Sequence, residues 1–417
     1  MLGFTRPVAF VDARVVTPCG LAGSLRFAST ILELGAPPRR GDVVVDLAGA
    51  FVLPGLINAH DHLELNHYGA LKPRARYLHA DDWIDDLRPR LHGDPTIRRR
   101  SGHALRERLF IGALKNLLAG ATTVAHHNPR YRELGLGCPV RVLARYGWAH
   151  SFSMEGQPVG AKGEPGGPVA GRCRATPPDR PFLVHVGEGT DARARHEMSR
   201  FAQLGCLRPN SVVVHGVAHT EDTWRAAVAA GTSLVWCPAS NVFLLGRTLP
   251  LGDLLQAVPG SADRVCLGSD SRLTGARDLL DELTHAHASA ELPKGLLLAM
   301  VTRNAARILR LPAAGRLAPG VPADLIVVPA SAGDDGDGGV PGEAERALLA
   351  AQRRDIRLVV IGGRPRIGEA AMQSVFDARR VGVGHITVDG AERLASARLV
   401  RRIAASPIGE PGLEARS

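Results

Sequence analysis

Strand-like segments alternate with helix-like segments through most of this chain of 417 residues. Between residues 51 and 311, short apolar runs rich in β-branched residues are followed by longer amphipathic runs. Parallel strands need a crossover connection, usually a helix, so this order predicts a parallel sheet covered by helices. Seven or eight such repeats over about 250 residues are typical of a closed (β/α)₈ TIM-like barrel, which is the α/β fold that we expect.

The expected strands of the barrel are short and apolar. They are Leu56–Ala59, Thr122–His126, Gly147–Phe152, Phe182–Val186, Ser211–Val214, Thr232–Trp236 and Arg264–Leu267. The expected helices carry apolar residues at a spacing of three or four. They are Ala104–Leu118, Ala192–Leu204, Asp222–Ala230, Asp278–Ala288 and Thr302–Leu311.

One repeat departs from this pattern. The segment from Gly156 to Pro178 is rich in Gly and Pro and has neither strand nor helix periodicity. A complete barrel would have its fourth βα unit near this position. We therefore expect this unit to be reduced, or replaced by a loop over the mouth of the barrel.

Further strand-like segments flank the barrel in the sequence, and we expect them to pair into one small β domain made from both termini. They are Val8–Val16, Asp42–Leu47, Ala323–Val328, Arg357–Ile361 and Gly384–Val388. Asp334–Gly339 reads as a solvated, mobile loop, and Ala391–Ala404 reads as a short helix. The expected domains are the composite β domain (1–56 and 312–390), the barrel (57–311), and a C-terminal helix and tail (391–417).

The net charge of +10 at first suggests a polyanionic partner. However, all but four of the 51 basic residues are scattered arginines, and aromatic residues make up only 4% of the chain. Single-strand binders need aromatic stacking platforms, so we expect no nucleic-acid partner and interpret the charge as background composition. No C-x-x-C pair, signal peptide or apolar run of about 18 residues is visible, so we expect a cytoplasmic protein without a membrane partner.

Histidines at the ends of the expected strands are the most informative residues. His60 and His62 follow an apolar strand and are two positions apart, so their side chains point to the same face. In a barrel this face is the interior, at the C-terminal mouth where active sites lie. Two imidazoles there form half of a zinc or iron site, although an H-x-H pair alone is more often structural.

Three further strands end in the same way. His185 is followed three residues later by Glu188, His215 ends the next strand, and Asp270 follows the last strand of the barrel. Burying so many ionisable groups without a metal would cost several kcal/mol. A shared metal site therefore explains these strand ends better than separate packing roles do.

These strand ends belong to a set of motifs that resembles the amidohydrolase superfamily, in particular its branch of aromatic-ring deaminases and triazine-type hydrolases. The motifs are Leu-Pro-Gly-Leu-Ile-Asn-Ala-His60-Asp-His62, His185-x-x-Glu188, His215-Gly, Cys237-Pro-Ala-Ser-Asn241, Gly268-Ser-Asp270 and Gly315-Arg-Leu-x-Pro-Gly-x-x-Ala-Asp324-Leu. The resemblance covers residues 8 to 365. It implies a distorted barrel and a composite β-sandwich from both termini, and relatives of this kind are often homodimers.

The resemblance also implies roles for the site residues. His60, His62, His185 and Asp270 would hold one divalent metal, with zinc favoured over iron or manganese. Asp270 would also accept a proton from water, Glu188 would carry it to the leaving nitrogen, and His215 would polarise the group under attack. The binuclear relatives use a bridging lysine on the fourth strand. Only Lys162 lies near that position, so a mononuclear site is favoured.

The function that we expect is hydrolysis of a C–N bond in a small molecule by a metal-activated water. Deamination of a ring amine is the first candidate and hydrolysis of a cyclic amide the second; the alternative is a non-catalytic binding or assembly protein. Many relatives have His where this chain has Trp236, which makes a nucleobase substrate less secure. The candidate substrate-binding residues are His126, His127, Trp236, Asn241 and Arg272, with packing or surface ion pairing as the alternative.

Overall fold

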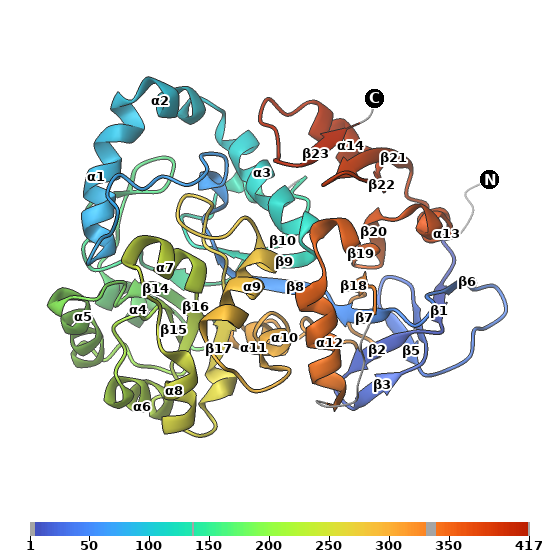
Figure 1. The fold of residues 1–417 in the computed structure, drawn as a ribbon, viewed down its shortest axis with the longest axis horizontal. Coiled ribbons are helices and arrows are strands. Elements are labelled where there is room, and N and C mark those ends of the chain that lie inside the picture. The colour runs from blue at the N-terminus through green and yellow to red at the C-terminus, as the bar shows by residue number, and fades with distance from the viewer. Residues whose placement is uncertain (1–4, 136, 331–338, 416–417) are drawn as a thin grey trace.

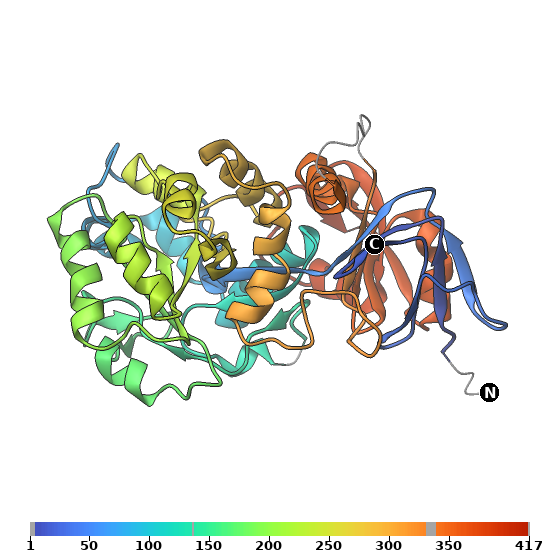
Figure 2. The ribbon, with the colours of Figure 1, turned by 90° about the horizontal axis from the view of Figure 1, so that it is seen from below.

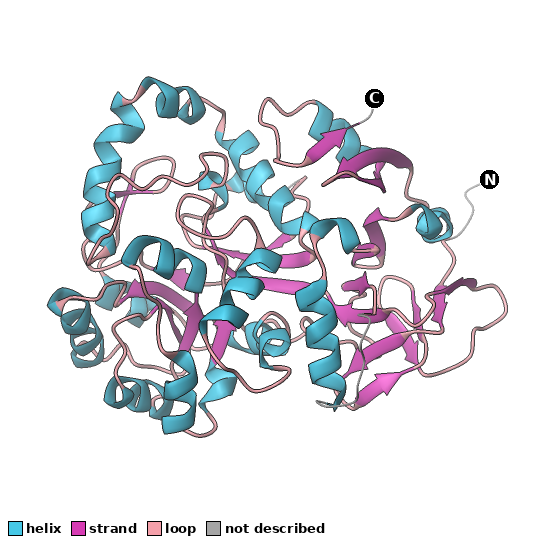
Figure 3. Cartoon of the chain, viewed as in Figure 1, coloured by secondary structure: helices cyan, strands magenta, loops and turns pink. Residues whose placement is uncertain are grey.

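The structure is a computed structural model that describes residues 5–135, 137–330 and 339–415. Its centre holds two parallel sheets, which appear in Figures 1 and 3 among helices. The three-stranded sheet has the order β10-β9-β8, and the five-stranded sheet has the order β11-β14-β15-β16-β17. The strands are β8 (Leu56–Asp61), β9 (Ala121–His126), β10 (Arg141–Val142), β11 (Gly147–Trp148), β14 (Phe182–Val186), β15 (Ser211–His215), β16 (Ser233–Trp236) and β17 (Val265–Leu267).

The two parallel sheets meet at β8 and β17. The Asp270 N–H, just after β17, donates to the His60 carbonyl in β8 at 3.1 Å. The strands β8, β9 and β14 to β17 are buried along their whole length, as expected of strands covered on both faces. The sequence therefore correctly predicted a parallel α/β arrangement, which brings the carboxyl ends of β8 and β17 together.

Helices follow most of these strands and begin at capping residues. Asp191 caps α5, Thr220 and Thr223 form a capping box at α6, and Asp278 caps α9. The helices of this part of the chain are α1 (Ala80–Gly93), α2 (Pro95–Ser101), α3 (Leu105–Leu118), α4 (Val169–Ala175), α5 (Ala192–Gln203), α6 (Glu221–Ala229), α7 (Pro238–Leu245), α8 (Leu251–Ala257), α9 (Leu279–Ser289), α10 (Leu296–Met300) and α11 (Arg303–Ile308).

The irregular region of the barrel differs from the expectation in two ways. The Gly/Pro-rich segment 156–178 does contain regular structure, namely the hairpin β12 (Pro158–Val159) with β13 (Glu164–Pro165) and the helix α4. The hairpin turn relies on Gly160 and Gly163, whose φ angles are 68° and 63°. In addition, no α-helix lies between β9 and β10 or between β10 and β11 in the described residues.

The strands from the two termini lie together at one end of the molecule (Figure 2). A nine-stranded sheet has the order β23-β21-β22-β20-β19-β18-β7-β2-β3, and a four-stranded sheet has the order β5-β4-β1-β6. The strand β7 joins the termini, because it pairs with β2 on one side and with β18 on the other. The bounds are β1 (Val8–Val11), β2 (Arg14–Thr17), β3 (Gly20–Ala22), β4 (Leu25–Phe27), β5 (Ile31–Leu34), β6 (Val43–Asp46), β7 (Phe51–Pro54), β18 (Leu325–Val328), β19 (Leu358–Ile361), β20 (Arg364–Gly368), β21 (Val383–Val388), β22 (Ala391–Ser396) and β23 (Leu413–Ala415).

Two expectations about the terminal segments are wrong in part. The run Val8–Val16 is broken at Asp12, whose φ of 44° turns the chain, so that β1 and β2 belong to different sheets. The expected helix Ala391–Ala404 begins six residues late, because residues 391–396 form β22 and pair with β21 along their whole length. The helix that remains is α14 (Ala397–Ala404). A domain boundary at residue 390 would therefore cut through a sheet.

The sequence analysis did not predict α12 (Gly339–Ala350) and α13 (Gln373–Ala378). Apart from Gly339, the acidic segment Asp334–Gly339 lies outside the described residues. Among the described residues, no helix has both the length and the apolar composition needed to cross a membrane.

Candidate metal centre

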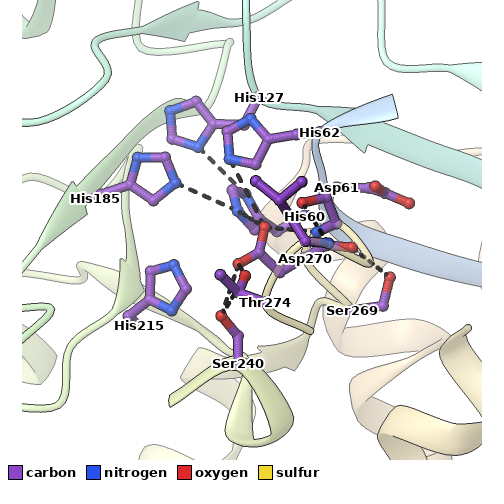
Figure 4. A network of polar contacts seen from close by, with 12 residues as sticks. His60, Asp61, His62, His127, His185, His215, Ser240, Ser269, Asp270 and Thr274 are labelled. Atoms are coloured by element: carbon purple, nitrogen blue, oxygen red, sulfur yellow. Dashed lines mark hydrogen bonds and ion pairs between the residues drawn. The ribbon is translucent and has the colours of Figure 1, made fainter. Parts of the chain in front are cut away.

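Side chains from the ends of four parallel strands converge on one buried point (Figure 4). The Nε2 atoms of His60 and His185 are 3.3 Å apart. Oδ1 of Asp270 lies 3.7 Å from His60 Nε2 and 3.8 Å from His62 Nε2. His215 belongs to the same cluster, since its donor atom lies within 4.8 Å of those of His60 and His185. The structure thus brings together the residues that the sequence nominated as metal ligands.

Hydrogen bonds orient the imidazoles so that their Nε2 lone pairs face the centre. His127 Nε2 lies 3.0 Å from the Ala149 carbonyl and must donate to it, so His127 Nδ1 accepts from His60 Nδ1 at 3.2 Å. His185 Nδ1 likewise donates to the His150 carbonyl at 2.8 Å. The Nε2 atoms of His60 and His185 therefore carry no proton and face each other with lone pairs.

This donor set fits a divalent metal. Two unprotonated nitrogens at 3.3 Å repel each other unless a cation lies between them. Ligands placed 2.0–2.1 Å from a tetrahedral zinc are about 3.3 Å apart, which agrees with the spacing of these nitrogens. Imidazoles that donate their second N–H to backbone carbonyls are also the usual arrangement at metal sites.

Burial keeps these imidazoles neutral. Desolvation, followed by repulsion from neighbouring imidazoles, holds the pKa values of His60, His127 and His185 well below the usual value. The same causes lower the pKa of His150 to about 3. Neutral imidazoles are the form that binds a metal, so no proton has to be removed from them at neutral pH.

Asp270 is held as a carboxylate by its neighbours. Its Oδ2 accepts from Ser240 Oγ at 2.8 Å and from Thr274 Oγ1 at 2.9 Å, and its Oδ1 accepts from the Ser271 N–H at 2.6 Å. Burial alone raises its pKa, but His62, His215 and these hydrogen bonds outweigh that effect, so that the pKa lies below its usual value. No sequence pattern pointed to Thr274, and Ser240 lies within the Cys237-Pro-Ala-Ser-Asn241 motif but had no predicted role.

Glu188 and His215 form a pair beside the candidate metal ligands. His215 Nε2 lies 3.6 Å from Glu188 Oε2, and His215 Nδ1 donates to Asn241 Oδ1 at 2.8 Å. Burial, and then the charge of Asp270, raises the pKa of Glu188 well above its usual value. Glu188 is therefore suited to hold a proton at neutral pH, and His215 Nε2 is placed to share it.

His215 and Asp270 both have backbone conformations that are unusual for residues other than glycine. Their φ angles are 70° and 51°, in the left-handed region. Such strain persists only where surrounding contacts maintain it, and it is common at functional sites. It turns both side chains at the strand ends toward the centre, which sequence periodicity cannot reveal.

A cavity of about 390 Å³ opens beside the centre. His62, His185, Glu188, His215 and Asp270 line its polar end. Its apolar wall is formed by one face of α1, the hairpin β12–β13 and side chains from neighbouring segments. The larger apolar side chains of this wall are Leu65, Tyr68, Trp83, Ile84, Leu87, Leu91, Met154, Val159, Leu244 and Leu273. The Gly/Pro-rich segment therefore does contribute a loop over the mouth of the site.

The structure places the five candidate substrate-binding residues in different environments. His127 and Asn241 contact His60 and His215, so they position other site residues and do not line the cavity. His126 is also absent from the lining, because its Nδ1 faces the Leu63 N–H and the Glu64 carboxylate. Trp236 does not line the cavity either, contrary to the prediction. Its ring is buried in the core, and its Nε1 donates to Thr248 at 2.8 Å.

Arg272 is likewise not placed to bind a substrate. It is buried, and its guanidinium forms a two-point ion pair with Glu410, at 2.8 and 2.5 Å. Of the two interpretations of Arg272, the structure shows an ion pair, although a buried one rather than one at the surface. The partner was not predictable, because Glu410 is 138 residues away in the sequence.

A buried ion pair next to the centre contacts the backbone of a candidate ligand. This pair was not predicted from the sequence. Lys115 of α3 is fully buried, with Nζ 3.1 Å from Asp61 Oδ2, and it donates to the backbone carbonyl of Asp270 at 3.1 Å. Gly112 permits this approach of α3, because a Cβ there would lie 2.1 Å from the Leu63 carbonyl oxygen. A lysine inside an apolar helical run was the only signal in the sequence.

The buried carboxyl group of Glu282 allows the effect of burial on a pKa near the site to be tested. Its Oε1 accepts from the Ala239 N–H at 3.0 Å, and burial raises its pKa from 4.5 to about 8. The folded chain thus holds this proton more tightly than the unfolded chain, so the resulting stability is complete below pH 4.5 and is lost as the pH rises to about 8. Glu282→Gln keeps the acceptor but removes the ionisation.

We expect Glu282→Gln to be more stable than the wild type at pH 8.5 and to lose this advantage toward pH 4.5. The difference is at most about 5 kcal/mol, from about 1.4 kcal/mol per pKa unit. Thermal unfolding of both proteins across this pH range measures it, with the exposed Glu221→Gln as control. A difference that does not change with pH would contradict the assignment.

Comparison with known proteins agrees with this geometry. Residues 182–365 match the model of the amidohydrolase family. A 5-methylthioadenosine/S-adenosylhomocysteine deaminase of Nitratidesulfovibrio vulgaris is 24% identical over 368 residues, which cover 77% of this chain and 80% of that protein.

Several solved structures with this fold contain zinc. An atrazine chlorohydrolase of Arthrobacter aurescens TC1 complexed with zinc superposes with a TM-score of 0.63 at 17% identity, covering 89% of this chain and 99% of that one. An adenosine deaminase of Xanthomonas campestris with bound zinc has a TM-score of 0.62 at 18% identity, covering 89% and 97%.

The TIM-barrel-type α/β fold, with its histidines and carboxylate at the strand ends, is the arrangement expected of a metal-dependent hydrolase. The family match over residues 182–365, together with the curated relatives, supports membership of the amidohydrolase superfamily. The family match and the deaminase names of the curated relatives support the predicted membership and the predicted hydrolysis of carbon–nitrogen bonds other than peptide bonds.

Proposed function

We propose that this chain is a mononuclear metal-dependent hydrolase that removes an amino group from the ring of a small molecule. The observation that carries the proposal is the convergence of unprotonated imidazole nitrogens and the Asp270 carboxylate beside the Glu188–His215 pair. His60, His62, His185 and Asp270 would hold the metal, with zinc as the favoured ion. Bound there, a divalent metal is a Lewis acid that lowers the pKa of a coordinated water toward about 7.

The residues of the chain would then handle the proton. Asp270 accepts it from the attacking water, while Ser240 and Thr274 keep its other oxygen in place. Glu188 carries the proton to the leaving nitrogen, a role that suits a buried carboxyl with a raised pKa. His215 steadies the group under attack through Nε2, which faces Glu188.

Ring deamination is favoured over cyclic-amide hydrolysis by the curated relatives. Those matched over two thirds or more of this chain are named as 5-methylthioadenosine/S-adenosylhomocysteine or 5′-deoxyadenosine deaminases. The apolar wall formed by Trp83, Ile84 and Leu87 also suits a flat ring. The exact substrate is left to the experiment below.

We further propose that the two parallel sheets are parts of one distorted (β/α)₈ barrel. The Asp270-to-His60 hydrogen bond supports closure between β17 and β8. The shared sheet around β7 supports a composite β-sandwich domain built from both termini, over residues 1–56 and 312–390. Because β22 continues that sheet, residues 391–396 are better assigned to this domain than to a tail.

Metal removal tests the function. We expect the purified protein to contain about one metal per chain, to lose turnover on chelation, and to regain it with Zn²⁺, Fe²⁺ or Mn²⁺. A screen of nucleobases, their nucleosides, hydantoins, triazines and imidazolones, scored for ammonia release against ring opening, separates deamination from amide hydrolysis. Less than about 0.5 metal per chain, with no activity restored by any of these ions, would favour a non-catalytic binding or assembly protein instead.

A further inference from the structure

A second cavity, of about 1020 Å³, lies between α3, β20, β22 and α14. These elements lie side by side in Figure 1, with α3 in teal and the C-terminal elements in red. The cavity shares no lining residue with the cavity at the metal centre. It is therefore a separate site.

The lining of this cavity is strongly basic. Its arginines come from three elements that are distant in sequence, and Glu133 is its one carboxylate among the described residues. These arginines are Arg106, Arg364, Arg366, Arg398, Arg401 and Arg402. Only Arg106 and Arg402 have a carboxylate partner, Glu107, at 3.3 and 2.8 Å. The other four form no ion pair within the described part of the chain.

Arg366 is the least satisfied of these side chains. Its Nε is buried and has no hydrogen-bond partner in the described residues. Burial, and then the positive charges of Arg364, Arg141 and Arg398, lowers its pKa. A partly buried guanidinium surrounded by like charges is unfavourable, and an anion bound in the cavity would offset that cost.

We propose that this cavity binds a small organic molecule that carries phosphate groups. Each planar guanidinium group can donate two parallel hydrogen bonds to the oxygens of a phosphate. The positive charges of the cavity also exceed what a ligand with a single carboxylate group would neutralise. Leu109, Leu134 and Leu399 add apolar surface for the organic part of the ligand. The cavity is also large enough to hold a whole small molecule.

A nucleic acid fits the cavity less well. Proteins that bind single-stranded nucleic acids stack the bases on exposed aromatic rings. Phe110 is the one aromatic ring in the described lining. The guanidinium of Arg402 covers that ring at 4.1 Å. The chemistry therefore favours a small phosphate ester over an oligonucleotide.

Calorimetric titration of the full chain with 1-naphthyl phosphate tests the proposal. We expect saturable binding of one ligand per chain, and binding at least about tenfold weaker for neutral 1-naphthol and for Arg366→Gln/Arg398→Gln. The control is Arg195→Gln/Arg225→Gln, which removes two exposed arginines from α5 and α6 and should leave the affinity unchanged. If Arg366→Gln unfolds the chain, Arg364→Gln/Arg398→Gln changes only exposed side chains and should weaken binding similarly.

Three results would overturn the proposal. One is the absence of binding by the wild type at millimolar ligand. A second is an equal loss of affinity in the cavity and control variants, which would indicate a general charge effect. The third is tighter binding of a short single-stranded oligonucleotide that the cavity variants abolish, since that would assign the surface to a nucleic acid.

Discussion

Replacing Asp270 by asparagine is expected to abolish both turnover and metal binding. The amide keeps the size of the side chain, but it removes the negative charge that faces His60 and His62 at 3.7 and 3.8 Å. In either orientation of the amide, its NH₂ group also faces donors: the hydroxyls of Ser240 and Thr274 in one orientation, and the Ser271 N–H in the other. The metal would lose its anionic ligand and the water its proton acceptor.

Glu188→Gln is the informative counterpart of this variant. Glu188 lies beside His215 and is not among the proposed ligands, so the variant should keep its metal. Loss of a general acid–base group lowers turnover by about 10²–10⁴-fold. Metal content and kcat are measured for both variants and for Asp179→Asn, an exposed control that should retain both. Equal metal loss in the Asp270 and Glu188 variants would show that the proposed division of roles is wrong.

The second large effect is expected at Lys115. Its ammonium is fully buried against Asp61, which also accepts hydrogen bonds from Asn66 and Asn116 at 2.8 and 2.7 Å. Lys115→Met leaves the Asp61 carboxylate buried without its cation, which typically costs about 3–5 kcal/mol. We expect a loss of unfolding free energy of this size, measured by denaturant titration.

A double variant separates charge from packing at this position. Lys115→Met/Asp61→Asn removes both charges, so it should recover part of the stability lost in Lys115→Met. Lys162→Met is the matched control, because Lys162 is about half exposed and only approaches Glu133 at 3.5 Å; it should cost less than about 1 kcal/mol. A single variant as stable as the wild type would contradict a supporting role for the buried pair.

Short-range sequence patterns correctly predicted most strands and helices of the parallel α/β region. Phe182–Val186 and Thr122–His126 agree with β14 and β9 to within one residue, and Ala192–Leu204 agrees with α5. These segments were predictable because burial on both faces makes a strand continuously apolar, whereas a helix shows its period within a few turns. The short strands β10 and β11 were not predictable in this way, since two residues carry no period.

The position of the candidate site also followed from local patterns, whereas the proposed ligand set came from the resemblance to the amidohydrolase superfamily. Residues at the carboxyl ends of parallel strands must meet at one edge of the sheet, so the strand ends at His60, His185, His215 and Asp270 were enough to nominate a site. The residues that orient these side chains were not. Ser240, Thr274 and Lys115 come from α7, the loop before α9, and α3, and their approach depends on how the helices pack.

The sequence by itself thus determined the alternation of strands and helices and the donors at the strand ends, and it indicated the superfamily. Each of these properties depends on residue type and on the local order of residues along the chain. Only the tertiary structure decided which nitrogen of each histidine faces the centre and that Arg272 pairs with Glu410. It also decided that four scattered arginines, which form no ion pair among the described residues, line one cavity. The physical reason is that these properties are pairwise contacts across long stretches of chain. Composition records how many arginines there are, but only packing brings them together.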